Sequence, residues 1–160
     1  ILFSGDLVEF DATPYSHASV MRRVFDEGIP SLPIGIRSLS APEAVFARET
    51  KIPIVWGHEL ESLEARFDGL LDRLPEKIYL TFDIDYFDPA LVPATGTPEP
   101  GGGTWYPTLR LLRRVFERKR VVAMDVVELA PVGGQPTSDF VAAKLAYKML
   151  GYWAAHRAAR

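Results

Sequence analysis

Three aspartates stand close together in the stretch YLTFDIDYFDPA, residues 79–90. Asp83 and Asp85 come at the end of an apolar run that is typical of a buried strand. Alternate residues of a strand share one face, with Cα atoms about 6–7 Å apart, so the two carboxylates would repel each other unless a proton or a divalent cation lay between them. The spacing therefore indicates a metal site. The ordinary alternative is a turn in which one aspartate caps a backbone amide and Asp88 simply precedes Pro89.

The segments that follow favour the metal site. VPATGTPEPGGGTW comes next, and its glycines would let the backbone approach a ligand closely. The next apolar run, VVAMDVVELAP, ends in Glu128. A glutamate at the end of a strand is most often solvated. Beside Asp83 and Asp85, however, this carboxylate could accept two hydrogen bonds from a cationic, fork-shaped group.

The remaining elements predict an α/β fold, because short apolar runs alternate with helix-like stretches. The apolar runs favour a parallel sheet of about five strands with helices on both faces. The expected strands are 1–3, 32–36, 52–56, 78–84 and 121–127. A first helix is expected from Ser16 or Ser19 to Gly28, and a short second one begins at Pro42. A third is expected over 60–74, with Pro75 as the stop, and a fourth has Pro107 at its first position. The last helix is expected from Ser138–Asp139 past Met149, with Phe140, Leu145 and Leu150 as its apolar members. The irregular stretch 85–106 is long enough to be functional.

Length and composition are those of one globular domain of 160 residues, with 48% hydrophobic and 24% charged residues. A formal net charge of −3 gives no reason to expect nucleic acid or a membrane as partner. The sequence has no cysteine, and we see neither a signal peptide nor a membrane span, so we expect the cytoplasm. The first residues, ILFSGD, lack an initiator Met and are apolar, so we expect an N-terminally truncated domain over 1–160.

Two long runs resemble the ureohydrolase family, the arginases and agmatinases, and the agmatinase branch in particular. They are DIDYFDPALVPATGTPEPGG at 83–102 and DVVELAP at 125–131. YSHASVMRRV at 15–24 and IGIRS at 34–38 also resemble agmatinase segments. The resemblance covers the chain but only the C-terminal portion of a family member, and it implies part of the arginase-like three-layer α/β/α fold. Members bind two Mn²⁺ ions bridged by a hydroxide, which attacks the guanidinium carbon and releases urea.

Site residues carry over from the family by position. The resemblance implies that Asp83 and Asp85 are metal ligands and that Asp88 is a supporting residue near them. It also implies that His17 is the proton-shuttling histidine, that Glu128 is the carboxylate that orients the guanidinium, and that Thr97 is the neighbour of Glu128. Carboxylate oxygens with imidazole suit Mn²⁺, and metal coordination makes hydroxide available near neutral pH. Histidine is suited to moving protons because its ordinary pKa lies near neutrality.

A second ligand run of the family, D-A-H-x-D, aligns with LFSGD at 2–6. Asp6 then matches its last aspartate, whereas Leu2 and Ser4 stand where an aspartate and the histidine belong. A register over 10–13, FDAT, would leave almost no loop before His17. A further family histidine, in a G-G-D-H-type segment, has no counterpart. We therefore expect a metal site of Asp6, Asp83 and Asp85, and no ion or one ion instead of two.

The leading functional hypothesis is manganese-dependent hydrolysis of a linear, agmatine-like guanidino compound that releases urea. The alternatives are a catalytically impaired remnant that binds a cation or guanidinium ligand or pairs with a partner chain, and a purely structural α/β fragment. The family resemblance implies a homo-oligomer. The strand over 121–127 would be an edge with exposed apolar residues, and such edges favour pairing with another chain.

Overall fold

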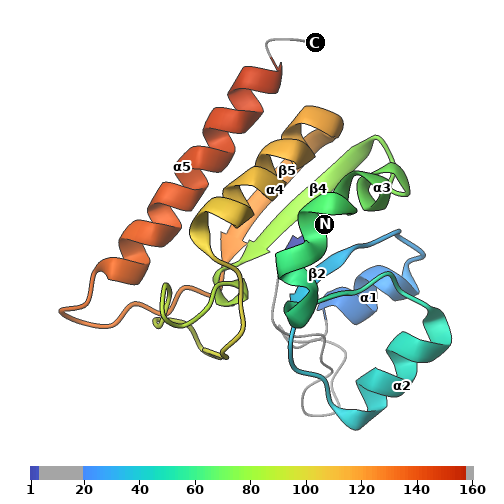
Figure 1. Cartoon of the computed structure of the whole chain (residues 1–160), viewed down its shortest axis with the longest axis horizontal. Helices are drawn as coiled ribbons and strands as arrows, with labels where there is room; N and C mark the ends of the chain where they lie inside the picture. Colours follow the sequence, from blue (N-terminus) through green and yellow to red (C-terminus); the bar gives the residue numbers. More distant parts are fainter. Residues whose placement is uncertain (4–19, 158–160) are drawn as a thin grey trace.

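A parallel sheet organises the computed structural model, which describes residues 1–3 and 20–157 (Figure 1). Its strands are β1 (Leu2–Phe3), β2 (Pro33–Ile36), β3 (Val55–Trp56), β4 (Lys77–Asp83) and β5 (Arg120–Val127). They lie in the order β3-β2-β1-β4-β5, and each pair is parallel. The predicted α/β class is confirmed. The strand of Asp83 lies between the first strand and the strand that precedes Glu128.

The strand order reverses direction at β1. The chain moves outward from β1 to β2 and β3, and then returns to place β4 on the other side of β1. Because crossovers between parallel strands are right-handed, α1 (Val20–Asp26) and α2 (Ala41–Thr50) cover the face opposite to α4 (Trp105–Arg118). Ligands of such sheets collect at the carboxyl ends of the strands beside this reversal, and β4 ends there at Asp83.

Local signals explain where α1 ends and where α2 begins. Ser40 and Glu43 form a capping box at the start of α2, in which the Glu43 amide donates to Ser40 Oγ and the Ser40 amide donates to Glu43 Oε2. The helix α1 ends at Asp26, and Gly28 follows with φ +68°, the left-handed conformation that only glycine adopts without cost. The predicted stop at Gly28 is therefore confirmed.

The predicted helix over 60–74 is wrong as a single element. The chain forms a 3₁₀ helix, η2 (Gly57–Ala65), followed by the short α3 (Phe67–Asp72). Both helix types bring residues i and i+3 to one side, so the apolar spacing could not distinguish them. The burial that it indicated is nevertheless correct, because Leu63, Phe67 and Leu71 are fully buried.

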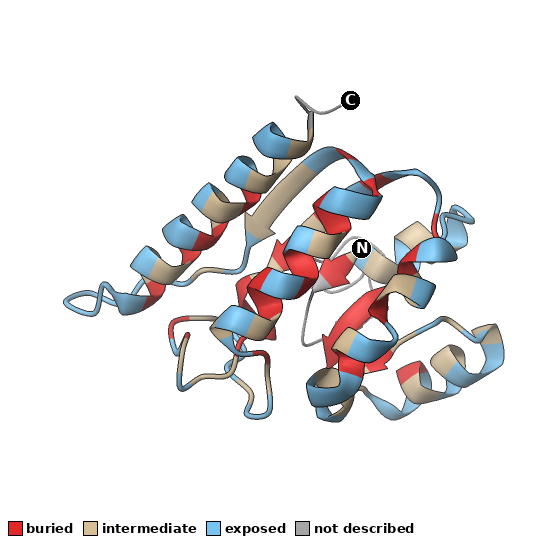
Figure 2. Ribbon diagram, turned by 45° about the horizontal axis from the view of Figure 1, so that its top comes forward, coloured by how far each residue is buried: buried red, intermediate tan, exposed pale blue. Residues whose placement is uncertain are grey.

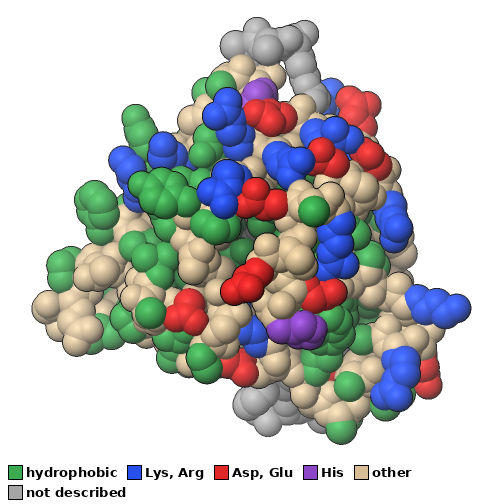
Figure 3. All heavy atoms as spheres, viewed as in Figure 1, with side chains coloured by type: hydrophobic (Ala, Val, Ile, Leu, Met, Phe, Trp, Pro, Cys, Tyr) green, Lys and Arg blue, Asp and Glu red, His purple; other side chains and the backbone are tan. Residues whose placement is uncertain are grey.

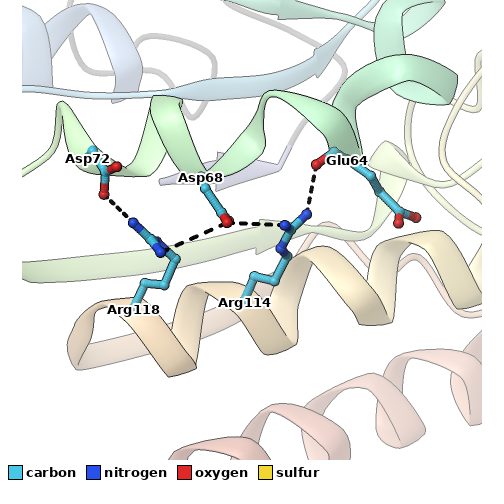
Figure 4. Close-up of polar contacts among 5 residues, drawn as sticks. All are labelled: Glu64, Asp68, Asp72, Arg114 and Arg118. Carbon is cyan, nitrogen blue, oxygen red and sulfur yellow. Dashed lines mark hydrogen bonds and ion pairs between the residues drawn. The ribbon is translucent and has the colours of Figure 1, made fainter.

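The helix α4 packs against β5 and α5 and carries an ion-pair ladder toward α3 (Figure 4). Arg114 donates to Asp68 at 3.1 Å and to the Glu64 carbonyl at 2.7 Å, and Arg118 donates to Asp72 at 2.5 Å. These contacts join α4 to η2 and α3. Pro107 was predicted to be the first residue of this helix. The helix begins at Trp105, so Pro107 is its third residue.

The long helix α5 (Thr137–Arg157) closes the core beside β5. The Trp153 indole donates to the Val121 carbonyl at 3.3 Å. Of the apolar members named from the sequence, Leu145 is fully buried, whereas Phe140 and Leu150 are 70% and 53% exposed. Figure 2 shows the buried residues of this helix along the side that faces the rest of the molecule.

No helix in the described part of the chain is both long enough and apolar enough to cross a membrane.

The strand β5 lies at one end of the sheet order, with β4 as its neighbour. Val122 is 56% exposed and Val127 is 39% exposed, as expected for an apolar strand at an edge. In Figure 3 apolar side chains gather on the side of the molecule where α5 lies, whereas charged side chains gather over α3 and α4. On the face that Figure 3 shows, apolar side chains are thus concentrated near α5 and ion pairs over α3 and α4.

Candidate metal and guanidinium site

Asp83 is the last residue of β4 and caps a short 3₁₀ turn, η3 (Ile84–Tyr86). Its Oδ1 accepts a hydrogen bond from the Asp85 amide at 3.0 Å. We expected the two aspartates to be neighbours on one face of a strand, and that reason is wrong because the strand ends at Asp83. The turn brings the two residues together instead, and the cap that was the ordinary alternative forms at the same place.

Asp85 is 4% exposed and is held by the loop that follows β4. Its Oδ2 accepts a hydrogen bond from Thr97 Oγ1 at 2.9 Å. The structure therefore places Thr97 against one of the two candidate metal ligands. A hydroxyl donor fixes the direction of a carboxylate while leaving its other lone pairs available for a cation.

Glu128 directly follows Val127, the residue that pairs with Asp83 across β4 and β5. It adopts φ +64°, a left-handed conformation that is rare for residues other than glycine and that is common at functional sites. Burial raises the pKa of Asp83, and the charges of Asp85 and Glu128 raise it further. The three carboxylates thus act on one another electrostatically.

The loops after β4 and β5 are joined to each other. Thr95 pairs with Leu129 in an antiparallel bridge, and the Ala130 amide donates to the Ala94 carbonyl at 3.0 Å. This pairing brings the loop that carries Thr97 alongside the strand end that carries Glu128. The long irregular stretch is therefore an ordered wall of the site.

Asp88 supports the same loop through its backbone. Its Oδ1 accepts from the Ala90 amide at 2.9 Å and its Oδ2 accepts from the Gly101 amide at 2.8 Å. These amides lower the pKa of Asp88. Both carboxylate oxygens are thus used within the loop, which agrees with a supporting role and also with the turn that was the ordinary reading.

The other two predicted site residues, Asp6 and His17, lie outside the described residues. Within 1–3 and 20–157, no group of three or more His, Cys, Asp or Glu side chains is placed to hold a metal ion. Asp83 and Asp85 nevertheless fit part of a metal site. A divalent cation would relieve the repulsion that raises the pKa of Asp83, and carboxylate oxygens are ligands that Mn²⁺ and Mg²⁺ accept.

With this geometry in view, similarity to known proteins decides the family. The sequence model of the arginase family matches residues 5–151. The chain belongs to the arginase family. It is 44% identical over 151 residues to an N(1)-aminopropylagmatine ureohydrolase of Synechocystis and 33% identical over 142 residues to an agmatinase of Pyrococcus horikoshii. The fold superposes on the agmatine ureohydrolase of Thermoplasma volcanium with a TM-score of 0.83 at 28% identity.

These matches cover nearly all of this chain but only about half of each matched protein. The Synechocystis match covers 93% of this chain and 49% of the relative, and the Pyrococcus match covers 89% and 50%. The Thermoplasma structure is matched over 95% of this chain and 53% of its own. The chain spans about half the length of the curated relatives it matches.

Two polar residues near this arginase-family site were not singled out by sequence reasoning. Arg37 donates to backbone carbonyls of the Asp85 turn. Asp125 lies on β5 before the site and accepts hydrogen bonds from Tyr79 and from Thr81 Oγ1, the latter at 2.6 Å. Each had a signal in the sequence. Arg37 is the charged residue of IGIRS directly after a strand, and Asp125 interrupts the apolar run VVAMDVV.

Proposed function

We propose that this chain carries the part of a ureohydrolase active site that binds metal and guanidinium. The reaction would be manganese-dependent hydrolysis of a linear, agmatine-like guanidino compound to urea and an amine. One observation supports this proposal above the others. Asp83, Asp85 and Glu128 converge at one end of β4 and β5, in a chain whose relatives are named as ureohydrolases.

The roles of the individual residues follow from their chemistry. Asp83 and Asp85 would hold Mn²⁺ together with Asp6, and a metal ion bound by such ligands supplies hydroxide near neutral pH. Thr97 would keep the Asp85 carboxylate in one orientation through the hydrogen bond described above. Asp88 would keep the loop in place.

Glu128 and His17 would act on the substrate itself. The Glu128 carboxylate would accept two N–H bonds from the planar guanidinium and so fix the carbon that is attacked. When the bond between that carbon and the alkyl nitrogen breaks, the departing nitrogen needs a proton. His17 would relay to that nitrogen the proton that the hydroxide oxygen loses as urea forms, so that hydroxide and guanidinium yield a neutral amine and urea with no net change in His17.

The substrate class is argued from the relatives. The names of the two similar enzymes refer to agmatine and to an aminopropyl derivative of it. Both compounds are linear and lack the carboxylate of arginine. We therefore propose a decarboxylated guanidino substrate. We further propose a homo-oligomeric, cytoplasmic protein in which residues 1–160 belong to one ureohydrolase domain.

The decisive experiment measures metal content and urea together. Purified chain would be analysed for Mn²⁺ by elemental analysis and for urea release from agmatine, N(1)-aminopropylagmatine and arginine. We expect bound Mn²⁺, urea from the first two compounds, and a loss of about 100-fold or more in Asp85→Asn. The matched control is Asp72→Asn, which removes an exposed carboxylate that pairs with Arg118 of α4.

Two results would contradict the proposal. Urea release that is unchanged in Asp85→Asn would remove this residue from the site. Bound guanidinium compound without metal and without urea would favour the impaired remnant instead, and dialysis with agmatine would detect such binding.

A further inference from the structure

Arg37 reaches from the end of β2 into the turn that carries Asp85. Its guanidinium donates to the Asp85 carbonyl at 2.5 Å, to the Tyr86 carbonyl at 3.2 Å and to the Gly35 carbonyl at 3.1 Å. One side chain therefore joins the end of β2 to the two residues that follow Ile84, although Arg37 and Asp85 are 48 positions apart in sequence.

The space that Arg37 occupies depends on glycine. A Cβ atom at Gly57, directly after β3, would lie 2.5 Å from Arg37 Cγ and 3.2 Å from the Gly101 carbonyl oxygen. Gly101 itself adopts φ +85°, and a Cβ at Gly102 would lie 2.5 Å from the Tyr86 carbonyl oxygen. The glycine run and the arginine stem thus pack against the same turn, which leaves no room for the turn to shift toward them.

The chemistry of arginine matches this task. A guanidinium is planar, remains charged at every relevant pH and presents several donors in a fixed fork, so one residue can serve three carbonyls at once. Lysine offers a single ammonium on a flexible stem and cannot hold the same set of acceptors in one geometry. Hydrogen bonds from a charged donor are also stronger than those from a neutral one.

Asp85 is consequently fixed at two points. Arg37 holds its carbonyl, and Thr97 Oγ1 holds its carboxylate at 2.9 Å. A second contact from the same strand end, in which Ser38 Oγ donates to Glu99, ties the far side of the loop to β2. The backbone of Asp85 is therefore held from the end of β2, a strand that supplies none of the expected metal ligands, while Thr97 holds its carboxylate.

We propose that Arg37 is a positioning residue of the metal site. It fixes the backbone of Asp85 and Tyr86 so that the Asp83–Asp85 pair is preorganised for a divalent cation. This inference rests on the proposed function for its metal, but the backbone contacts that define it do not. Removing Arg37 would free the turn and weaken metal binding without unfolding the core.

The test uses three variants of the whole chain. Arg37→Met keeps the length of the stem but removes all donors, and Arg37→Lys keeps the charge without the fork. Arg110→Met is the control, because Arg110 is an exposed arginine of α4 whose ion-pair partner is Glu64 and not a residue of the Asp85 turn. Each variant would be examined by thermal unfolding, amide hydrogen exchange without metal, and Mn²⁺ titration.

Amide exchange reports the positioning directly. The Gly103 amide donates to the Tyr86 carbonyl at 2.9 Å and the Asp88 amide donates to the Gly103 carbonyl at 3.1 Å. In Arg37→Met we expect these amides to exchange about tenfold or more faster while those of α4 are unchanged. We expect Mn²⁺ affinity to fall about tenfold or more at a similar Tm, an intermediate loss in Arg37→Lys and no change in Arg110→Met.

Two outcomes would overturn the proposal. Unchanged loop exchange in a folded Arg37→Met protein would overturn it. Faster exchange throughout α4 as well would make Arg37 a general stabilising residue and would also overturn it. If Arg37→Met fails to fold, Arg37→Lys takes its place. Faster amide exchange confined to the loop would then support a positioning role, and faster exchange that also includes α4 would overturn it. If the unmodified chain binds no Mn²⁺, the proposed function fails and the exchange result still decides the role of Arg37.

Discussion

Asp83 concentrates the electrostatic cost of the site in one side chain. It is half-buried beside Asp85, and both burial and the neighbouring carboxylates raise its pKa. Asp85 carries a hydrogen bond from Thr97 and Asp88 carries two from backbone amides, so the acids of one short stretch have different surroundings. A carboxylate that is costly to ionise without a cation is expected at a metal site and is unexpected in a merely structural turn.

At the residue scale, we predict a specific pH dependence of stability in the metal-free chain. Because the folded-state pKa of Asp83 is raised, the folded state binds more protons than the unfolded state, in which an aspartate has a pKa of about 3.9. The contribution of Asp83 to stability is therefore fully present below about pH 4 and is lost as the pH rises through its raised pKa. We expect Tm to fall from about pH 5 to about pH 9 by more in the parent than in Asp83→Asn.

Calorimetry of both proteins at the two pH values checks this prediction. Added Mn²⁺ should restore more of the lost Tm at the higher pH in the parent, because the ion replaces the proton between the carboxylates. Asp72→Asn is the control and should follow the parent. Equal pH profiles for parent and Asp83→Asn would show that the burial of Asp83 has no energetic consequence.

At the scale of the elements, α5 carries apolar residues on two sides. Leu145 and Met149 are buried against the core, whereas Phe140, Tyr147 and Leu150 are exposed. A helix that is apolar on all sides is normally buried on all sides, so spacing alone could not tell which side faces the core. The packing against β5, marked by the bond from Trp153 to the Val121 carbonyl, decides it.

The two sides of α5 should differ in their response to truncation. Leu145→Ala would leave a cavity in a fully buried position and is expected to lower the free energy of unfolding by about 2–5 kcal/mol. Leu150→Ala removes the same atoms from an exposed position and is expected to change it by less than about 0.5 kcal/mol. Urea unfolding followed by circular dichroism measures both. Similar losses in the two variants would mean that the outer side is also packed in solution.

At the scale of the whole molecule, the surface over β5 and α5 has fewer ion pairs, in the part of the chain that the structure describes, than the surface over α3 and α4. Exposed apolar residues lie on the edge of β5 and, beside Lys144, on the outer side of α5, whereas arginines and acids form the ladder over α3 and α4 (Figures 3 and 4). Among the described residues, β4 is the neighbour that pairs with β5, so the outer edge of β5 is available for another strand. The proposed homo-oligomer would bury the surface over β5 and α5.

This arrangement predicts self-association through the surface over β5 and α5. Val122→Lys places a charge on the edge strand, and Tyr147→Lys places one on the outer side of α5; both residues are exposed, so folding should be retained. Analytical ultracentrifugation should show weaker concentration-dependent association for both variants. Val45→Lys, at an exposed position of α2, is the control. Association unchanged by both variants, or reduced equally by Val45→Lys, would place the interface elsewhere.

Much of the fold could be predicted because its signals are local. The apolar runs that form β4 and β5, the left-handed stop at Gly28 and the acids at the strand ends are each set by a few adjacent residues. The division of 57–72 into a 3₁₀ helix and a short α-helix could not be predicted, because residues i and i+3 meet in both. Likewise, the meeting of Asp83 and Asp85 was expected, but a turn and not a strand brings it about.

The sequence by itself determined that three acids stand at the ends of two successive apolar runs and that a glycine-rich loop lies between them, because composition and spacing along the chain are enough for this. Only the tertiary structure decided what these acids touch. Thr97 lies on Asp85, Glu128 follows the partner of Asp83 in a left-handed conformation, and Arg37 reaches the Asp85 carbonyl from 48 residues away. Such contacts depend on strand order and on loops that pair across the sheet, and chain-local preferences carry no record of either.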